Sequence, residues 1–403
     1  MIIAVVFAAT ACGPPGFDSQ VRQYVRLAVA LGERDPDSID FYYGPPQWVA
    51  DIRKNPPRLE EIRRSAVELG RKLEPDRHAR AKHLAGQLKA IATRADELLG
   101  RQETFDRKTS AYFGLTLPAA APPNTEQERK EIDRLLPGAG SLAQRYAAFD
   151  RQFLVPADRL PAVMARAVQG CQDQTLQHLQ LPTGETVQVE YVHDKPWSAF
   201  SRYQGNYQSL IWVNVDLGLT VDRVLQLACH EAYPGHHAQN VLQDLRLVRG
   251  LHWMEWTVQP TFSPQSLVSE ALATFAVKIA FPAQERMRFE RDALFPIAGL
   301  DPKTAEKYDR VERFVDKLQS AEPAIARDFL DGKLEWARAA NALEEQVLMA
   351  SPEQTLKYIS EYRAYMITYT LGPELVSEQV HNWKQFEQMM SDPDAAERII
   401  MNR

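Results

Sequence analysis

Cysteine is scarce in this sequence, which has only Cys12, Cys171 and Cys229 among its 403 residues. So few isolated cysteines build neither the disulfide framework of a small secreted domain nor a cysteine-rich zinc ribbon. Cys171 and Cys229 are therefore predicted to be buried packing residues. Cys229 directly precedes His230, but neighbouring helical side chains point in different directions, so the two form no nucleophile–base pair.

The sequence also lacks an excess of basic charge. Its 47 Lys and Arg residues face 53 Asp and Glu residues, which gives a net charge of −6. Without a dense Lys/Arg run there is no electrostatic footprint for nucleic acid, so we expect no nucleic-acid partner. The composition, 45% hydrophobic and 25% charged, is that of a globular protein long enough for a large core or two domains.

Long apolar runs are missing except at the start of the chain. "MIIAVVFAATAC" (1–12) is too short to span a bilayer and ends in small residues, as secretory signals do. Its "ATAC" ending resembles a bacterial lipobox, which predicts a lipidated Cys12 and an extracytoplasmic protein, in the periplasm or anchored to a membrane. The alternatives are a misassigned start or a buried first helix.

Residues 17 to about 183 are predicted to be mostly helical. "SQVRQYVRLAVALG" places an apolar stripe on one face and is expected to end at Gly32 as a C-terminal cap. Charge-laced amphipathic helices are predicted at 57–75 and 77–99. The aromatic stretch "DFYYGPPQW" (40–48) is interpreted as a turn-rich loop that packs on the helices or lines a cleft.

The periodicity changes near residue 184. "ETVQVEYVH" (185–193) alternates apolar and polar residues, and "SLIWVNV" (209–215) is rich in β-branched and aromatic residues, so both are predicted strands. Helical patterns return afterwards. The fold class is therefore mainly α with a small β-sheet beside the suspected site, and three regions are expected: a leader (1–12), an N-terminal helical region (13–184) and a catalytic region (185–403).

The stretch "LACHEAYPGHHAQN" (227–240) contains the candidate chemistry. In the helical zinc motif H-E-x-x-H the two histidines stand four residues apart and reach one ion from the same face. Here the later histidines are His236 and His237, but Pro234 must break or bulge the helix. A two-residue bulge would bring His236 to His230, and a three-residue bulge would bring His237 there. We favour His236, with His237 as a supporting or substrate contact.

A catalytic zinc ion usually takes three protein ligands and keeps one position open for water. "FSPQSLVSEALATFAVKIAF" predicts a helix capped by Ser263, with Glu270 among apolar residues. An ionised carboxylate there is costly unless it binds a cation, so Glu270 is the predicted third ligand. The alternative is a Glu270 paired with Lys or Arg. Glu255 and Glu285, each among polar residues, are weaker candidates.

The string H-E-x-x-P-G-H-H, followed by a helix carrying Ser-Glu-Ala, resembles the bacterial domain-of-unknown-function 885 family. That family is similar to the glutamate-zincin metallopeptidases, and the resemblance covers roughly residues 185–380. It implies a Zn²⁺ cofactor held by His230, Glu270 and either His236 or His237, with Glu231 as general base. The chain departs from the family where "RAYMITYTLG" replaces a Pro-Gly-Gln-Ala stretch.

Further residues are predicted to bind a peptide substrate. The tyrosines of "YISEYRAYMITYTLG" fall on one face of a helix, and Tyr365 or Tyr369 could donate to an oxyanion, the alternative being an aromatic packing face. Arg363 is a candidate carboxylate anchor. The strand with Trp212 and Asn214 could pair with an extended peptide at a sheet edge.

The resulting prediction is a zinc metallopeptidase, a hydrolase that activates water with zinc and Glu231. A zinc hydrolase of another amide or ester is one alternative, and a non-catalytic zinc-binding surface lipoprotein is the other. Glu231 separates them, because a structural zinc site needs no base. The sequence leaves open the peptide specificity, the native metal and the oligomeric state.

Overall fold

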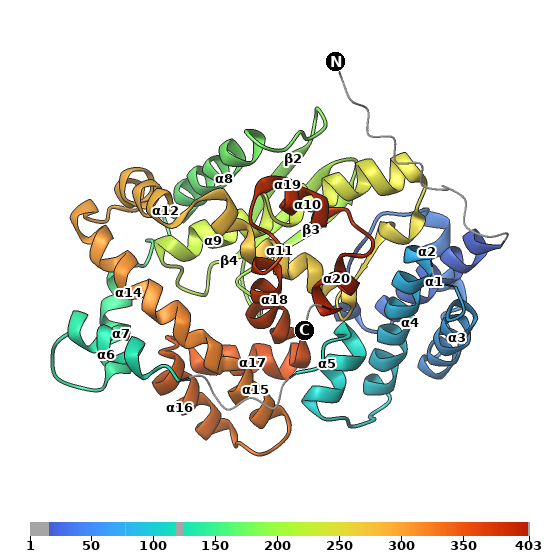
Figure 1. Cartoon of the computed structure of the whole chain (residues 1–403), viewed down its shortest axis with the longest axis horizontal. Coiled ribbons are helices and arrows are strands. Elements are labelled where there is room, and N and C mark those ends of the chain that lie inside the picture. The colour runs from blue at the N-terminus through green and yellow to red at the C-terminus, as the bar shows by residue number, and fades with distance from the viewer. Residues whose placement is uncertain (1–15, 77, 118–123, 402–403) are drawn as a thin grey trace.

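The computed structural model describes residues 16–76, 78–117 and 124–401, and these form a mainly helical fold with two small sheets (Figure 1). The predicted fold class is confirmed. The predicted leader with Cys12 lies outside the described residues. Within them, no single helix has the length and apolar composition needed to cross a membrane, although one helix pair bent by 77°, Pro264–Ala280 with Ala283–Ala298, meets both criteria together.

The first part of the chain is helical apart from one short strand, as predicted. Its elements are α1 (Phe17–Gly32), η1 (Pro36–Ser38), β1 (Ile39–Tyr42), α2 (Pro46–Lys54), α3 (Leu59–Leu73), α4 (Ala79–Leu98), α5 (Phe105–Phe113), α6 (Glu126–Leu135), α7 (Leu142–Asp150), η2 (Arg151–Phe153) and α8 (Leu160–Leu176).

Three strands and the site helices follow, and then a long helical part. The elements are β2 (Thr186–Val192), β3 (Ala199–Gly205), β4 (Gln208–Asn214), α9 (Val221–Glu231), α10 (His236–Gln243), η3 (Asp244–Arg249), η4 (Met254–Thr257), β5 (Val258–Pro260), α11 (Pro264–Ala280), α12 (Ala283–Phe289), η5 (Glu290–Leu294), α13 (Phe295–Ala298), η6 (Pro302–Thr304), α14 (Ala305–Leu318), η7 (Gln319–Ala321), α15 (Glu322–Leu330), α16 (Trp336–Val347), α17 (Pro352–Tyr362), η8 (Arg363–Met366), α18 (Ile367–Ser377), α19 (Trp383–Met390) and α20 (Ala395–Met401).

The larger sheet has the strand order β2-β4-β3, with β2 parallel and β3 antiparallel to β4. Both predicted strands are present as β2 and β4. The prediction that "SLIWVNV" offers a free edge to a peptide is wrong, because β4 is the central strand and is hydrogen-bonded on both sides. The strand that covers its other side, β3, was missed because "AFSRYQG" mixes charged and small residues with few β-branched ones.

The loop predicted at 40–48 is also wrong. Residues Ile39–Tyr42 form β1, which pairs with β5, and α2 begins at Pro46. Tertiary pairing with a strand more than 200 positions later decides this structure, and no local pattern reports it. Part of this segment lines the cavity described below, which was one of its two interpretations.

Helix α1 ends at Gly32 as predicted, but not because Gly32 adopts a left-handed cap. The backbone of Gly32 does not have a positive φ. A Cβ built on Gly32 would lie 2.5 Å from the Cδ1 atom of Ile39. Because Gly32 has no side chain, the side chain of Ile39 in β1 can pack directly against α1. The Pro- and Ala-rich stretch at 115–128, which its composition predicts to be an exposed connection, falls partly outside the described residues, and Leu115 at its start is buried.

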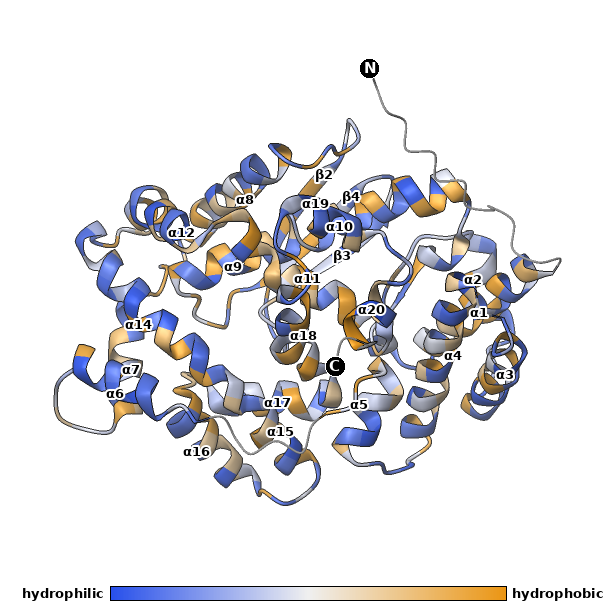
Figure 2. Ribbon diagram, in the orientation of Figure 1, coloured by the Kyte–Doolittle hydropathy of each residue, from blue (hydrophilic) through white to orange (hydrophobic). Residues whose placement is uncertain are grey.

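Helix α11 lies at the centre of the molecule, and most of its residues are buried (Figures 1 and 2). It packs against α9 and α18, and its buried side chains join a cluster that runs from Ala90 to Ile399. A second cluster joins α1, α3 and α4 and includes Val258 of β5. Burial of this much apolar surface is the main source of stability in such a fold.

The prediction that Cys171 and Cys229 are only packing residues needs correction. Both are fully buried, but they form a disulfide with a Cα–Cα distance of 5.4 Å. The bond joins α8 to α9, the helix that carries His230. Like the β1–β5 pair, it crosses the division predicted at residue 184, and that division stays a prediction.

Candidate metal centre and its cavity

The helix carrying His230 breaks where the sequence predicts. Helix α9 ends at Glu231, and α10 starts at His236 after a turn that contains Pro234. The backbone N–H of Gly235 donates to the carbonyl of Cys229 at 3.0 Å. A Cβ at position 235 would lie 1.8 Å from the carbonyl oxygen of His230, so only glycine lets the chain fold back this closely.

This turn brings His230, His236 and Glu270 together. The Nε2 atoms of the two histidines lie 3.3 Å from the two carboxylate oxygens of Glu270, His230 facing Oε2 and His236 facing Oε1. The imidazole rings are nearly perpendicular, with centroids 4.7 Å apart. One potential ligand atom from each residue lies within 4.8 Å of the other two. Two nitrogens and one carboxylate are the donor set of a catalytic zinc site.

The surroundings of the three residues fit a cation. Glu270 is only 6% exposed, and its Oε2 atom has no hydrogen-bond donor. The Oγ atom of Ser269 donates to Gln239, so it can accept the Nδ1–H of His236, which lies 3.2 Å away. That arrangement leaves the Nε2 lone pair of His236 directed at the centre, as supporting hydrogen bonds do in zinc proteins. Throughout the described ranges no other group of three such side chains meets the same distance criterion.

The carboxyl of Glu270 and the imidazole of His236 shift each other's pKa. Burial by itself opposes ionisation of Glu270, but His236 and His230 hold the pKa of its carboxyl well below the usual value. Burial also opposes protonation of His236, yet Glu270 raises its pKa to about 9. Burial raises the pKa of Glu231, which is 5% exposed and lines the cavity next to the centre. No side-chain hydrogen bond restrains Glu231.

His237 does not belong to the metal centre, and its prediction as a ligand is not supported by its position. Its ring is fully buried, with Nε2 2.7 Å from a carboxylate oxygen of Glu185 and Nδ1 2.8 Å from the Oγ atom of Ser209. Tyr233 also donates to Glu185. His237 therefore fixes the turn after Pro234 to the larger sheet.

The four tyrosines of the C-terminal stripe do not lie on one helix, contrary to the prediction. Helix α17 ends at Tyr362, and Arg363 has a φ of 51°, in a region that L-residues rarely adopt. The chain then continues through η8 into α18. Nevertheless Tyr358, Tyr362, Tyr365 and Tyr369 all line the same cavity. The break allows residues from two helices to face it.

Tyr365 and Tyr369 have different surroundings. The hydroxyl of Tyr365 is buried and donates to the Oε1 atom of Glu270 at 2.8 Å, so it supports a ligand and does not face a substrate. Tyr369 is 36% exposed, and its ring centroid lies 6.1 Å from that of His230. Its hydroxyl accepts from Tyr358 at 3.3 Å and has its own proton free. Of the two predicted oxyanion donors, only Tyr369 has a hydroxyl that is not bound to Glu270.

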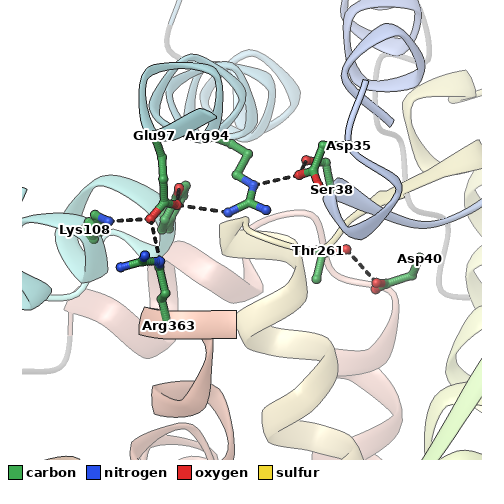
Figure 3. Close-up of polar contacts among 9 residues, drawn as sticks. Asp35, Ser38, Asp40, Arg94, Glu97, Lys108, Thr261 and Arg363 are labelled. Carbon is green, nitrogen blue, oxygen red and sulfur yellow. Dashed lines mark hydrogen bonds and ion pairs between the residues drawn. The ribbon is translucent and has the colours of Figure 1, made fainter. Parts of the chain in front are cut away.

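Arg363 is not placed to anchor a substrate carboxylate. Its guanidinium pairs with Glu97 at 3.3 Å and does not line the cavity. Glu97 also pairs with Lys108 and with Arg94, and Arg94 reaches Asp35 at 2.8 Å (Figure 3). This network ties α4 and α5 to the break between α17 and α18, so Arg363 has a structural position.

Of the two predicted substrate contacts on β4, Trp212 and Asn214, one lines the cavity and the other does not. Trp212 lines the cavity, and its Nε1–H donates to Glu190. Asn214 is 1% exposed, and its amide donates to the backbone carbonyls of Lys195 and Trp197. Asn214 therefore holds the loop before β3 and does not face the cavity.

The centre opens into a cavity of about 480 Å³. Its walls come from the β1 region, from β3 and β4, and from the tyrosines of α17 and α18. The cavity-lining residues that the sequence did not reveal include Asp40, Ser201, Arg202 and Gln259. Of these four, only Asp40 could have been noticed in the sequence, as an acidic residue within the aromatic stretch "IDFYY". No sequence pattern marks the other three, because their elements meet only in the folded chain.

Comparisons with known proteins leave the function open. No family model and no curated protein matches the chain. Two solved structures are similar to it: a predicted lipoprotein from Colwellia psychrerythraea, with 14% identity and a TM-score of 0.47 over 96% of this chain and 75% of that one, and a predicted lipoprotein of unknown function from Shewanella oneidensis, with 12% identity and a TM-score of 0.47 over 96% and 84%. Similarity this low has no bearing on the activity. The family resemblance stays a prediction.

Proposed function

We propose that this protein is a zinc-dependent peptidase whose metal is held by His230, His236 and Glu270. The observation that carries the proposal is the position of Glu231. It follows a ligand directly in sequence, lines the cavity and makes no side-chain hydrogen bond, so its carboxylate is available to a bound water or substrate. A structural zinc site has no use for such a group.

A zinc ion held by His230, His236 and Glu270 would supply a water acidic enough to act as a nucleophile near neutral pH. Glu231 accepts the proton of the attacking water and delivers it to the leaving amine. The free O–H of Tyr369 donates to the oxygen that becomes negative as the carbonyl is attacked. Tyr365 and Ser269 hold Glu270 and His236 in place.

The test is Glu231→Gln, which keeps the shape of the side chain and removes the base. We expect the purified variant to retain one zinc per chain and to lose peptide hydrolysis by at least a hundredfold, in line with the contribution of a general base. Metal content is measured by mass spectrometry, and activity by digestion of a peptide library with and without a chelator. Gln226, which precedes Glu231 by five residues on α9 and lies outside the cavity, provides the control substitution Gln226→Glu.

Two alternatives give different results in the same experiment. A hydrolase of other amides or esters would lose that activity in Glu231→Gln but leave the peptide library intact in both forms. A non-catalytic zinc-binding lipoprotein would bind zinc and show no chelator-sensitive hydrolysis of any substrate. The disulfide between Cys171 and Cys229 supports the predicted extracytoplasmic location, because disulfides persist in oxidising compartments.

A further inference from the structure

The wall of the cavity formed by β1 and β5 contains an irregular strand pair. Ile39 pairs with Pro260 and Phe41 with Gln259, so Asp40 is an extra residue in a β-bulge. Bulges redirect a side chain that would otherwise follow the alternation of the strand. Asp40 lines the cavity, and its Oδ1 atom accepts a hydrogen bond from Thr261 at 2.7 Å (Figure 3).

Asp40 has no cation of the protein as a partner. No lysine or arginine in the described ranges pairs with it, and the nearby Arg53 is paired with Glu33 at 2.8 Å. Asp40 lines the same cavity as His230, His236 and Glu270, which places it on a wall of the cavity that the metal centre opens into. A carboxylate in such an enclosed place is stabilised by a cation that enters with the ligand.

Two further side chains that line the same cavity each have a polar atom without a hydrogen-bond partner. The Oγ atom of Ser201 and the Nε2 atom of Gln259 make no hydrogen bond, although the residues are 6% and 4% exposed. Gln265 donates to the Oε1 atom of Gln259 at 2.6 Å, which fixes the amide and leaves its N–H₂ group without a partner. Buried polar groups without partners are rare, and at a cavity wall they indicate hydrogen bonds completed by a ligand.

We propose that Asp40 binds an ammonium group of the peptide substrate, while Gln259 donates to a backbone carbonyl beside it and Ser201 completes the subsite. This inference rests on the proposed peptidase function. The carboxylate matches the charge of an ammonium, and the amide matches a peptide carbonyl. The ammonium is either the free amino terminus or the end of a lysine side chain. Because Asp40 lines the cavity that the metal centre opens into, the first source means cleavage close to the amino terminus.

Binding of short peptides to the inactive Glu231→Gln protein tests the subsite without turnover. The probes are trialanine, its N-acetyl and des-amino forms, and N-acetyl-Ala-Lys-Ala, each measured by calorimetry on the zinc-loaded protein. We expect trialanine to bind at least tenfold more tightly than both blocked forms if the amino terminus is recognised. If lysine is recognised, N-acetyl-Ala-Lys-Ala binds at least tenfold more tightly than N-acetyl-trialanine.

Adding Asp40→Asn should remove either preference and leave the zinc content unchanged. Thr261→Val, which deletes the hydrogen bond that positions Asp40, should reduce the preference partly. Asp51→Asn is the matched control, because Asp51 is an exposed acid of α2 outside the cavity, paired with Arg26. Its preference should equal that of the parent.

The inference is overturned if charged and blocked peptides bind equally, or if a preference persists in Asp40→Asn. Its failure is distinct from that of the proposed function. A wild-type enzyme that cleaves free and N-acetylated library peptides at equal rates remains a peptidase without this subsite. A wild-type protein that cleaves neither refutes the peptidase function, and the binding data still decide whether Asp40 recognises an ammonium.

Discussion

At the scale of single residues, the proposed metal centre depends on side chains outside its three ligands. Tyr365 comes from η8, donates to Glu270 and lies 3.1 Å from the hydroxyl of Ser266. These contacts fix the orientation of the Glu270 carboxylate. Partners of this kind contribute to metal affinity although they never touch the ion.

Replacing Tyr365 by Phe should therefore weaken zinc binding by about 10- to 100-fold, with little change in helical content. The measurement is competition between the protein and a chromophoric chelator. Tyr362→Phe is the matched control, because Tyr362 lines the same cavity and its hydroxyl makes no hydrogen bond. Equal zinc affinities for the two variants would show that the Tyr365 hydroxyl does not support the centre.

At the scale of elements, the break between α9 and α10 creates the site. An unbroken helix would carry His230 and His236 on different faces, since successive residues are about 100° apart. The turn that contains Pro234 moves His236 into contact with Glu270, and the backbone of Gly235 packs against the last carbonyls of α9. No side chain can be accommodated there without displacing backbone atoms.

Gly235→Ala should consequently destabilise the protein by about 3 kcal/mol or more and lower its zinc content. Urea unfolding and metal analysis measure the two effects. Gly70→Ala is the control: Gly70 lies within α3, and its new Cβ would meet only the Cβ of Leu88 at 3.9 Å. It should be neutral or stabilising by up to about 1 kcal/mol. A stable, zinc-replete Gly235→Ala protein would contradict this account of the turn.

At the scale of the whole molecule, the N-terminal helices are part of the site and not an appendage. They supply the cavity wall around β1, and one buried ion pair fastens them to the chain after α10. Arg80 of α4 makes two hydrogen bonds to Glu255, at 2.6 and 2.9 Å, and Glu255 is completely buried. Arg80 also lies over the rings of Phe17 and Trp253.

Glu255→Ala would leave the Arg80 guanidinium buried without a counter-charge, which should cost about 3–5 kcal/mol of stability. Glu103→Ala is the control, because it breaks an exposed pair with Arg107 and should change stability by no more than about 0.5 kcal/mol. Both values come from urea unfolding at neutral pH. Similar losses in the two variants would mean that the buried pair does not fasten the N-terminal helices.

The sequence could predict features that depend on short spacings. Apolar periodicity predicted α1, α3 and α4, because a helix buries one face whatever it packs against. Pro234 predicted the break, because proline cannot continue the hydrogen bonding of a helix. Glu270 was predicted as a ligand from its place among apolar residues, and the structure brings it to His230 and His236.

Features that depend on contacts between distant segments could not be predicted. The disulfide of Cys171 and Cys229, the pairing of β1 with β5, and the partners of His237 and Arg363 arise when residues far apart in sequence meet. Two histidines at positions 236 and 237 look equivalent in the sequence. Only the direction of the chain after Pro234 decides which imidazole faces Glu270 and which faces the sheet.

The sequence by itself determined the helical class and the break after α9, and it predicted the types of metal ligand, because these follow from local sterics and from the cost of burying charge. The tertiary structure alone decided which side chains surround the centre and its cavity. The physical reason is that burial and hydrogen bonding at the site come from packing among the β1–β5 pair, the larger sheet, α11 and α18, and no stretch of sequence contains those contacts.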